Sequence, residues 1–328
     1  MNPLHRPRLL PSWISLCIFL FTSFIIRAQQ APSIQAKELL STAKGHLDSL
    51  LYERAATQGE KALALFEASL GYEHLQTSKA LQLLGEIELE RGHFARAKKN
   101  FTKALAIRKK REDKPDSLII ETLIALGQTA EGKGDLSQAM TYFEEALQRQ
   151  KASLGVWHRF TGIIYMRIGV VHDLNGAYEE ALHWHFKAEK VFSKVLPPNA
   201  RGWAVLYGCI GIVYDFKGEL NLALDYQLKA LDILQRIYPE KHVQTANCYN
   251  NIGILHRRKG DYRKALLYQE KALQIRLALH GKTHPSVGAS FNNLGVIHRH
   301  VGELEEALEY FHQALQVRKS IFGENHRR

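Results

Sequence analysis

The chain has 328 residues, of which 45% are apolar and 23% charged, and these proportions exclude a disordered or collagen-like chain. It carries 44 Lys and Arg against 33 Asp and Glu, a formal net charge of +11 that favours anionic partners such as nucleic acid or membrane. Three cysteines are too few for a disulfide scaffold.

The first 28 residues have the pattern of an export signal. His5, Arg6 and Arg8 precede an uncharged, largely apolar run over residues 12–26. This run is shorter than the roughly 20 residues that a membrane-spanning helix needs. We therefore expect cleavage near Ala28, a linker over residues 29–34, and a periplasmic or secreted protein. The alternative is an uncleaved anchor formed by residues 9–26, and in that case alone the membrane is a partner.

Residues 35–328 repeat with a period of 42 residues. One glycine register is Gly85, Gly127, Gly169, Gly211, Gly253 and Gly295, and a second is Gly92, Gly134, Gly176, Gly218, Gly260 and Gly302. Alanine recurs with the same period, for example at Ala181, Ala223, Ala265 and Ala307. The period predicts seven units: 35–76, 77–118, 119–160, 161–202, 203–244, 245–286 and 287–328.

Each unit is predicted to form a pair of helices. Over residues 246–279 the apolar residues recur every three or four positions, and this pattern is interrupted at Gly260. Glycine tolerates the left-handed conformation that ends a helix, and Asp261 can cap the next helix. Gly253 and Ala265 are small, as expected where two antiparallel helices cross closely. Since one helix pair cannot bury its own apolar face, neighbouring pairs must stack.

The unit resembles the tetratricopeptide repeat, in the 42-residue form of kinesin light chains. The residues that carry this resemblance are Tyr249, Ile252, Gly253, Gly260, Tyr262, Ala265, Tyr268 and Ala272. The segments Asn250-Asn251-Ile252-Gly253 and Asn292-Asn293-Leu294-Gly295 are similar to that form as well. The resemblance implies an all-α fold, a right-handed α-α superhelix of seven helix-turn-helix repeats.

Histidines recur at two positions of the repeat. One set lies in the loops between units, where we expect it to cap loops and not to bind metal: His74, His158, His242, His284 and His326. His172, His256 and His298 share another position, where we expect half-buried packing residues. We expect no metal site, no cofactor and no catalysis, because the sequence contains no metal-ligand or nucleophile motif and no domain beyond the repeats to hold one.

The candidate binding site lies on the first helix of each unit, because these helices line the inner surface of such a solenoid. The residues expected there in the last two units are Asn247, Asn250, Asn251, Arg257, Arg258, Asn292, Asn293, Arg299 and His300. Asparagine can pair with a peptide backbone and arginine with a carboxylate. In proteins that the chain resembles, such residues hold an extended peptide. The alternative is that the asparagines only bridge neighbouring repeats.

Other inner positions differ in character from this basic end. Units two and three carry Glu86, Glu90, Glu121 and Glu131, and units four and five carry Ile163, Met166, Val170, Val205, Ile212 and Phe216. A basic stretch between Lys98 and Arg111 is expected to form a solvated outer face.

We therefore expect an exported scaffold that binds a peptide or protein segment, acidic or carboxylate-bearing, in its concave groove. One alternative is the N-terminal sensory or regulatory module of a longer signalling or protease-like effector. A third is an RNA-binding helical repeat, although nucleic acid is not expected because export would separate the chain from most of it. Self-association through an uncapped last repeat is a further option for the partner.

The signal interpretation predicts that the mature protein begins near Gln29. N-terminal sequencing of the exported protein checks this. Recovery of a chain that still starts at Met1 in the membrane fraction would favour the anchor.

Overall fold

The fold is taken from a computed structural model that describes residues 32–110, 116–238 and 241–322. The regular structure of these residues is entirely helical, with short turns between the helices and no strand among them. The first helix covers residues 32–48, and the others follow in chain order: α2 (Tyr52–Leu70), α3 (Leu75–Glu90), α4 (Phe94–Lys109), α5 (Asp116–Lys133), α6 (Leu136–Ser153), α7 (Arg159–Leu174), α8 (Tyr178–Val195), α9 (Arg201–Phe216), α10 (Leu220–Ile237), α11 (Val243–Arg258), α12 (Tyr262–His280), α13 (Pro285–Val301) and α14 (Leu304–Phe322). The predicted export signal and its cleavage site lie outside the described residues.

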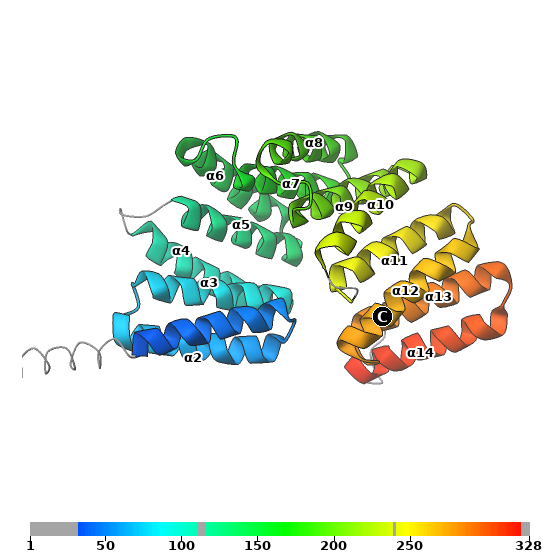
Figure 1. Cartoon of the computed structure of the whole chain (residues 1–328), viewed down its shortest axis with the longest axis horizontal. Helices are drawn as coiled ribbons and strands as arrows, with labels where there is room; N and C mark the ends of the chain where they lie inside the picture. The colour runs from blue at the N-terminus through cyan, green and yellow to red at the C-terminus, as the bar shows by residue number, and fades with distance from the viewer. Residues whose placement is uncertain (1–31, 111–115, 239–240, 323–328) are drawn as a thin grey trace, which may run out of the picture. The chain divides into compact units, whose positions relative to one another are not determined.

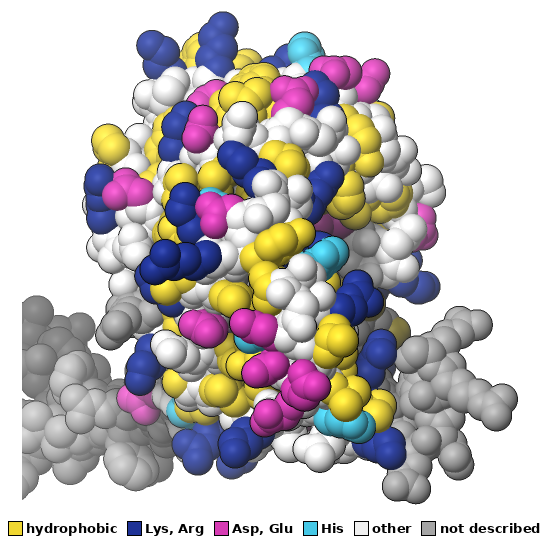
Figure 2. Space-filling view, turned by 90° about the vertical axis from the view of Figure 1, so that its right-hand side faces the viewer, with side chains coloured by type: hydrophobic (Ala, Val, Ile, Leu, Met, Phe, Trp, Pro, Cys, Tyr) yellow, Lys and Arg dark blue, Asp and Glu magenta, His cyan; other side chains and the backbone are white. Residues whose placement is uncertain are grey.

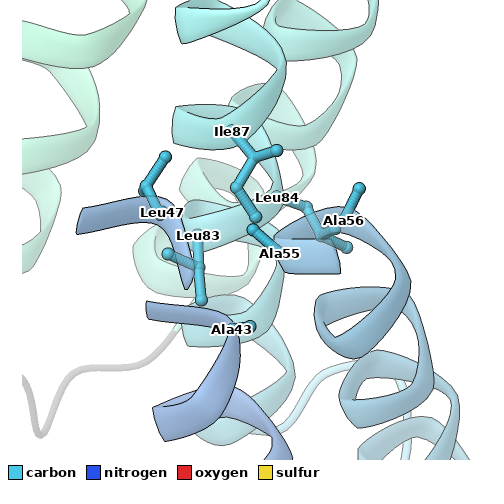
Figure 3. Packing of buried hydrophobic residues seen from close by; sticks show 7 residues of the cluster. All are labelled: Ala43, Leu47, Ala55, Ala56, Leu83, Leu84 and Ile87. Carbon is cyan, nitrogen blue, oxygen red and sulfur yellow. The ribbon is translucent and has the colours of Figure 1, made fainter. Parts of the chain in front are cut away.

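The chain forms two compact units, one ending at Arg149 and the other beginning at Gln150. Within each unit, consecutive helices form antiparallel pairs that stack on one another (Figure 1). This arrangement confirms the predicted all-α helical-repeat fold. In the first unit, for example, the helix over residues 32–48 packs with α2 and α3 around Ala55, Leu83, Leu84 and Ile87 (Figure 3). No helix of the described chain is long and apolar enough to cross a membrane.

The helix ends are set by the residues that the repeat predicts. Gly260 has φ +79° and ends α11, and Asp261 accepts a hydrogen bond from the Lys264 N–H at the start of α12. Four loop histidines cap α3, α7, α11 and α13: in each, the side chain accepts the backbone N–H two residues later, and these residues are His74, His158, His242 and His284. The predicted capping role is therefore confirmed for these four, while His326 lies outside the described residues.

The predicted packing role holds for two histidines of the second set. His256 stacks on Tyr268 and His298 stacks on Tyr310, with ring centroids 5.5 and 5.2 Å apart. Tyr214 stacks on Tyr226 in the corresponding place of the preceding repeat. Each of these ring pairs joins the two helices of one repeat. Histidine therefore takes the place of tyrosine here as a flat packing surface.

The two helices of a pair approach most closely at a glycine. A Cβ added to Gly169, Gly211 or Gly295 would lie 3.1 Å from the carbonyl oxygen of an alanine on the facing helix. The residue one turn after this alanine covers the glycine: in three pairs it is Phe101, Phe143 or Phe311, and in two it is Gln227 or Gln269. Glycine therefore allows the close crossing in the pairs from Gly85 onward, as the period predicted, while the covering residue varies; in the first repeat the buried Ala43 takes the corresponding position.

His185 is the covering residue in the pair α7–α8 and is wholly buried. Neither of its ring nitrogens has a hydrogen-bond partner among the described residues. Burial without a compensating acceptor disfavours the imidazolium and lowers the pKa of His185 to about 4. The side chain is therefore held neutral in the folded protein.

Acidification is expected to destabilise the fold through this residue. Below pH 6.5 the unfolded chain takes up a proton that the folded chain rejects, so the free energy of unfolding falls as the pH drops from 6.5 towards 4. His185→Phe introduces the residue that covers the glycine in three other pairs. It should reduce the loss of unfolding free energy between pH 7 and pH 5 by about 2 kcal/mol. Urea unfolding at both pH values measures it. Equal losses in the wild type and the variant would contradict the assignment.

Candidate functional site

The nine predicted site residues come from α11 and α13, two helices that contact each other. Asn250, Asn251, Arg257 and Asn293 are half-buried, whereas Asn247, Arg258, Asn292, Arg299 and His300 are exposed. Some of these side chains contact one another, and others contact residues that were not predicted to belong to the site.

Two of the asparagines bridge the last two repeats. The Asn293 Nδ2 donates to Asn250 Oδ1 at 2.9 Å, and the Asn250 Nδ2 lies 3.4 Å from Asn251 Oδ1. The bridging role weighed against ligand contact is therefore real for Asn250 and Asn293. Because the Asn250 oxygen accepts inside the protein, the orientation of its amide is fixed.

Arg276 of α12 holds this amide cluster in place. Its guanidinium donates to Asn247 Oδ1 at 3.1 Å and lies 3.5 Å from Asn250 Oδ1. It also donates to the Ser286 carbonyl at 3.2 Å and to Ser290 Oγ at 2.8 Å, both on α13. Burial lowers the pKa of Arg276. We call this arrangement, in which a buried arginine bonds a carbonyl and a hydroxyl of the next repeat, the arginine latch.

A second arginine latch lies four repeats earlier. Arg108 of α4 is buried and donates to Gln82 Oε1, the Leu118 carbonyl and Thr122 Oγ1. The expectation that the whole basic stretch between Lys98 and Arg111 is solvated is therefore wrong for Arg108. The neighbouring Lys109 and Lys110 are exposed; Lys109 pairs with Glu145 of α6, and Lys110 pairs with Glu73 in the loop before α3.

Arg258 is already paired inside the protein. It donates both to the backbone carbonyl of Asp215 and to its carboxylate, which joins α11 to α9. Burial raises the pKa of Asp215, and the charge of Arg258 opposes this effect. His300 stacks on Tyr262, with ring centroids 5.4 Å apart. Arg258 is therefore already neutralised within the chain, and one ring face of His300 is covered by Tyr262.

Arg257 and Arg299 differ from Arg258 in this respect. Within the described chain, neither forms an ion pair with a carboxylate. Asn292 is separate from the other site residues: it lines a cavity between α13 and α14. We use the name basic inner face for Asn247, Asn250, Asn251, Asn293, Arg257 and Arg299.

Apolar side chains are exposed on the neighbouring helix α9. Phe216 is 62% exposed and lies next in sequence to Asp215, the partner of Arg258, and Ile212 is exposed one turn earlier. Met166 of α7, predicted at an inner position, is buried instead. Among the acidic positions of the first unit, Glu86 accepts a hydrogen bond from Gln82 and lies 3.6 Å from Lys44.

No group of three or more His, Cys, Asp or Glu side chains in the described chain is arranged to hold a metal ion. Cys248 is buried, and burial raises the pKa of its thiol to about 12. This thiol is therefore held in its protonated, unreactive form at neutral pH.

The stacked helix pairs, the small residues at their crossings and the polar inner face define a helical-repeat scaffold. The tetratricopeptide repeat family matches residues 46–110, 120–153, 204–278 and 287–328, more than half of the chain. The chain belongs to this family, with repeats of the 42-residue form similar to kinesin light chains. A comparison with curated proteins finds no significant match.

Several solved structures share the fold. BtubC (BKLC) from P. vanneervenii is 24% identical, with a TM-score of 0.58, over 73% of this chain and 95% of its own. A kinesin light chain repeat protein of Podosopora anserina is 17% identical, with a TM-score of 0.53, over 64% and 99%. The Rap conjugation gene regulator of plasmid pLS20, in complex with the Phr* peptide, is 17% identical, with a TM-score of 0.69, over 92% and 80%.

The arginine latch is expected to stabilise the stacking of repeats. Arg276→Ala removes the buried donor to the Ser286 carbonyl and the Ser290 hydroxyl, and should lower the free energy of unfolding by about 2 to 4 kcal/mol. Denaturant unfolding measures the loss. Arg263→Ala, an exposed arginine of the same helix, is the control and should change it by less than about 0.5 kcal/mol. Equal effects would show that the latch contributes nothing.

Proposed function

We propose that the protein is a scaffold that binds a peptide or protein segment on its basic inner face. The observation that carries the proposal is the pair Arg257 and Arg299, which form no close ion pair within the described chain and follow, on α11 and α13, amides that Arg276 orients or that bond to one another. The Rap regulator of pLS20, which shares the fold, is seen with a bound peptide. Tetratricopeptide repeats are typically non-catalytic, and we infer no catalytic step for this chain.

The ligand is proposed to carry carboxylates. Arginine forms bidentate, charge-assisted hydrogen bonds with a carboxylate, and such bonds are about twice as strong as neutral ones. The half-buried asparagines offer both donors and acceptors, which suits the backbone of an extended segment. Arg258 is excluded as a ligand group because Asp215 already neutralises it.

An apolar residue is expected beside the carboxylates in the ligand. Phe216 and Ile212 are exposed on α9, and the Asp215–Arg258 pair joins α9 to α11, the helix that carries Asn250 and Arg257. Covering such exposed apolar surface contributes roughly 25 cal/mol per Å². An acidic segment with one bulky apolar side chain therefore fits this part of the second unit best.

The proposed site of action is outside the cytoplasm, and the support for it is the signal-like sequence of residues 1–28. Two other functions stay as alternatives: the sensory or regulatory module of a longer effector, and RNA binding. The side of the molecule in Figure 2 shows basic side chains mixed with acidic and hydrophobic ones. On this side the mixture differs from the clustered positive surface that is typical of nucleic-acid binding, and it favours a protein ligand.

Arg257→Ala combined with Arg299→Ala is expected to weaken binding of an acidic, phenylalanine-containing peptide at least tenfold. The physical reason is the loss of two charge-assisted contacts, each of about 1.5 to 3 kcal/mol when desolvated. Isothermal titration calorimetry with a library of such peptides measures the affinity, and circular dichroism checks that helicity is unchanged.

The matched control is Arg54→Ala combined with Arg263→Ala, two arginines that are exposed on α2 and α12. It removes the same charge from outside the basic inner face. If both double variants lose affinity equally, the attraction is only the diffuse field of a basic protein and the proposed site is wrong.

A further inference from the structure

A groove between α13 and α14 forms the surface of the last described repeat. It has a volume of about 550 Å³, and its lining includes Phe311, Leu315 and Ile321 together with Asn292 and Arg318. No described residue covers it, and Leu315 is 48% exposed. We call this cavity the end groove. Both Arg318 and Leu315 lie outside the basic inner face.

The end groove resembles two surfaces, on α12 and α4, that are each covered by the next helix of the chain. Arg318 stands 42 residues after Arg276, and Asn292 stands 42 residues after Asn250. In the preceding repeat this arginine is buried by α13, which lies on α12. In the first unit the corresponding Arg108 is buried by α5, which lies on α4. The repeat therefore shows twice what this kind of groove accepts: an α-helix.

The two seated helices share a sequence pattern. Each provides a backbone carbonyl to the arginine, and four residues later a hydroxyl: Leu118 and Thr122 in α5, Ser286 and Ser290 in α13. Apolar residues three before, one after and four after the hydroxyl are buried in both helices. They are Ile119, Leu123 and Leu126 in α5, and Val287, Phe291 and Leu294 in α13.

We propose that the end groove binds an amphipathic helix of a partner protein that carries this pattern: apolar, two residues, Ser or Thr, apolar, two residues, apolar. Arg318 takes the role of the latch and donates to the carbonyl and hydroxyl in the first turns of the partner helix. Phe311, Leu315 and Ile321 cover its apolar stripe. Arginine is suited to this because its fork of N–H groups can serve two acceptors at once.

A second copy of the chain fits this groove poorly. In an end-to-end contact, a second copy would present the helix over residues 32–48, because this is the first helix of the described chain. In that helix the four pattern positions are Gln35, Glu38, Leu39 and Thr42, so two of the three apolar positions are polar. Burying polar groups against Phe311 and Leu315 without partners would cost more than it returns. A partner with the full apolar stripe is therefore the better occupant.

A labelled synthetic peptide of residues 116–133, the α5 sequence, serves as the probe for the full chain. Fluorescence anisotropy should show saturable binding, and circular dichroism a gain of helix, because a free peptide of this length is marginally helical. Arg318→Ala in the protein and Thr122→Val in the peptide should each weaken binding at least fivefold. The two changes together should weaken it little more than either does alone, since each removes the same contact.

Two further variants locate the binding site. Leu315→Glu should abolish binding, because it places a charge on the apolar floor of the groove, and Arg263→Ala should leave binding unchanged. Both alter residues that are exposed in the chain alone, and thermal melts check that the fold is kept. Absence of binding at millimolar peptide, or binding that Arg318→Ala and Leu315→Glu do not weaken, would overturn the proposal. A dimer in sedimentation velocity that Leu315→Glu disperses and the peptide does not would make a second copy the occupant, which also overturns it.

Discussion

The close crossing of the two helices in each repeat is the constraint on which the rest of the structure depends. At Gly169, Gly211 and Gly295 a Cβ would lie 3.1 Å from a backbone oxygen of the facing helix, so a larger side chain there would push the two helices apart. The close crossing sets the position of one helix relative to the other within each pair. Neighbouring pairs can then repeat the same contacts at intervals of 42 residues. The side chains around this crossing vary: His185 is one of the residues that cover it, and the polar groups of α11 lie on the inner face.

Much of this architecture could be predicted because it depends on contacts inside one repeat. Gly260, Asp261 and the capping histidines act on residues within a few positions of themselves, so their roles follow from spacing alone. The ring pair of His256 and Tyr268 joins two helices of one repeat, and the period fixes their distance in sequence. Where the sequence supplies these residues the structure follows the rule, whereas α9, which begins after Ala200, has no side-chain cap.

The candidate site was harder to predict because it depends on contacts between repeats. Arg258 occupies an inner position, as expected, but its neutralisation by Asp215 depends on how α11 lies against α9. Arg276 was not predicted as part of the site, because a lone arginine on an amphipathic helix resembles a solvated one. A signal was present in the sequence: Arg108 and Arg276 share one position of the repeat, and so do the hydroxyl residues Thr122 and Ser290 that accept from them.

The histidine caps have a consequence for the joints between repeats. A cap works only while Nδ1 carries a lone pair, since it must accept the N–H of the residue two positions later. Burial, and with it a nearby arginine, lowers the pKa of His158, His242 and His284, which keeps the acceptor available at neutral pH. A protonated ring would lose that bond and also place a positive charge at the positive end of the helix dipole. Because these caps stand at the starts of α7, α11 and α13, acid would weaken the first turns of these three helices of the second unit together, while the start of α9, which follows Ala200 and has no side-chain cap, would not respond in this way.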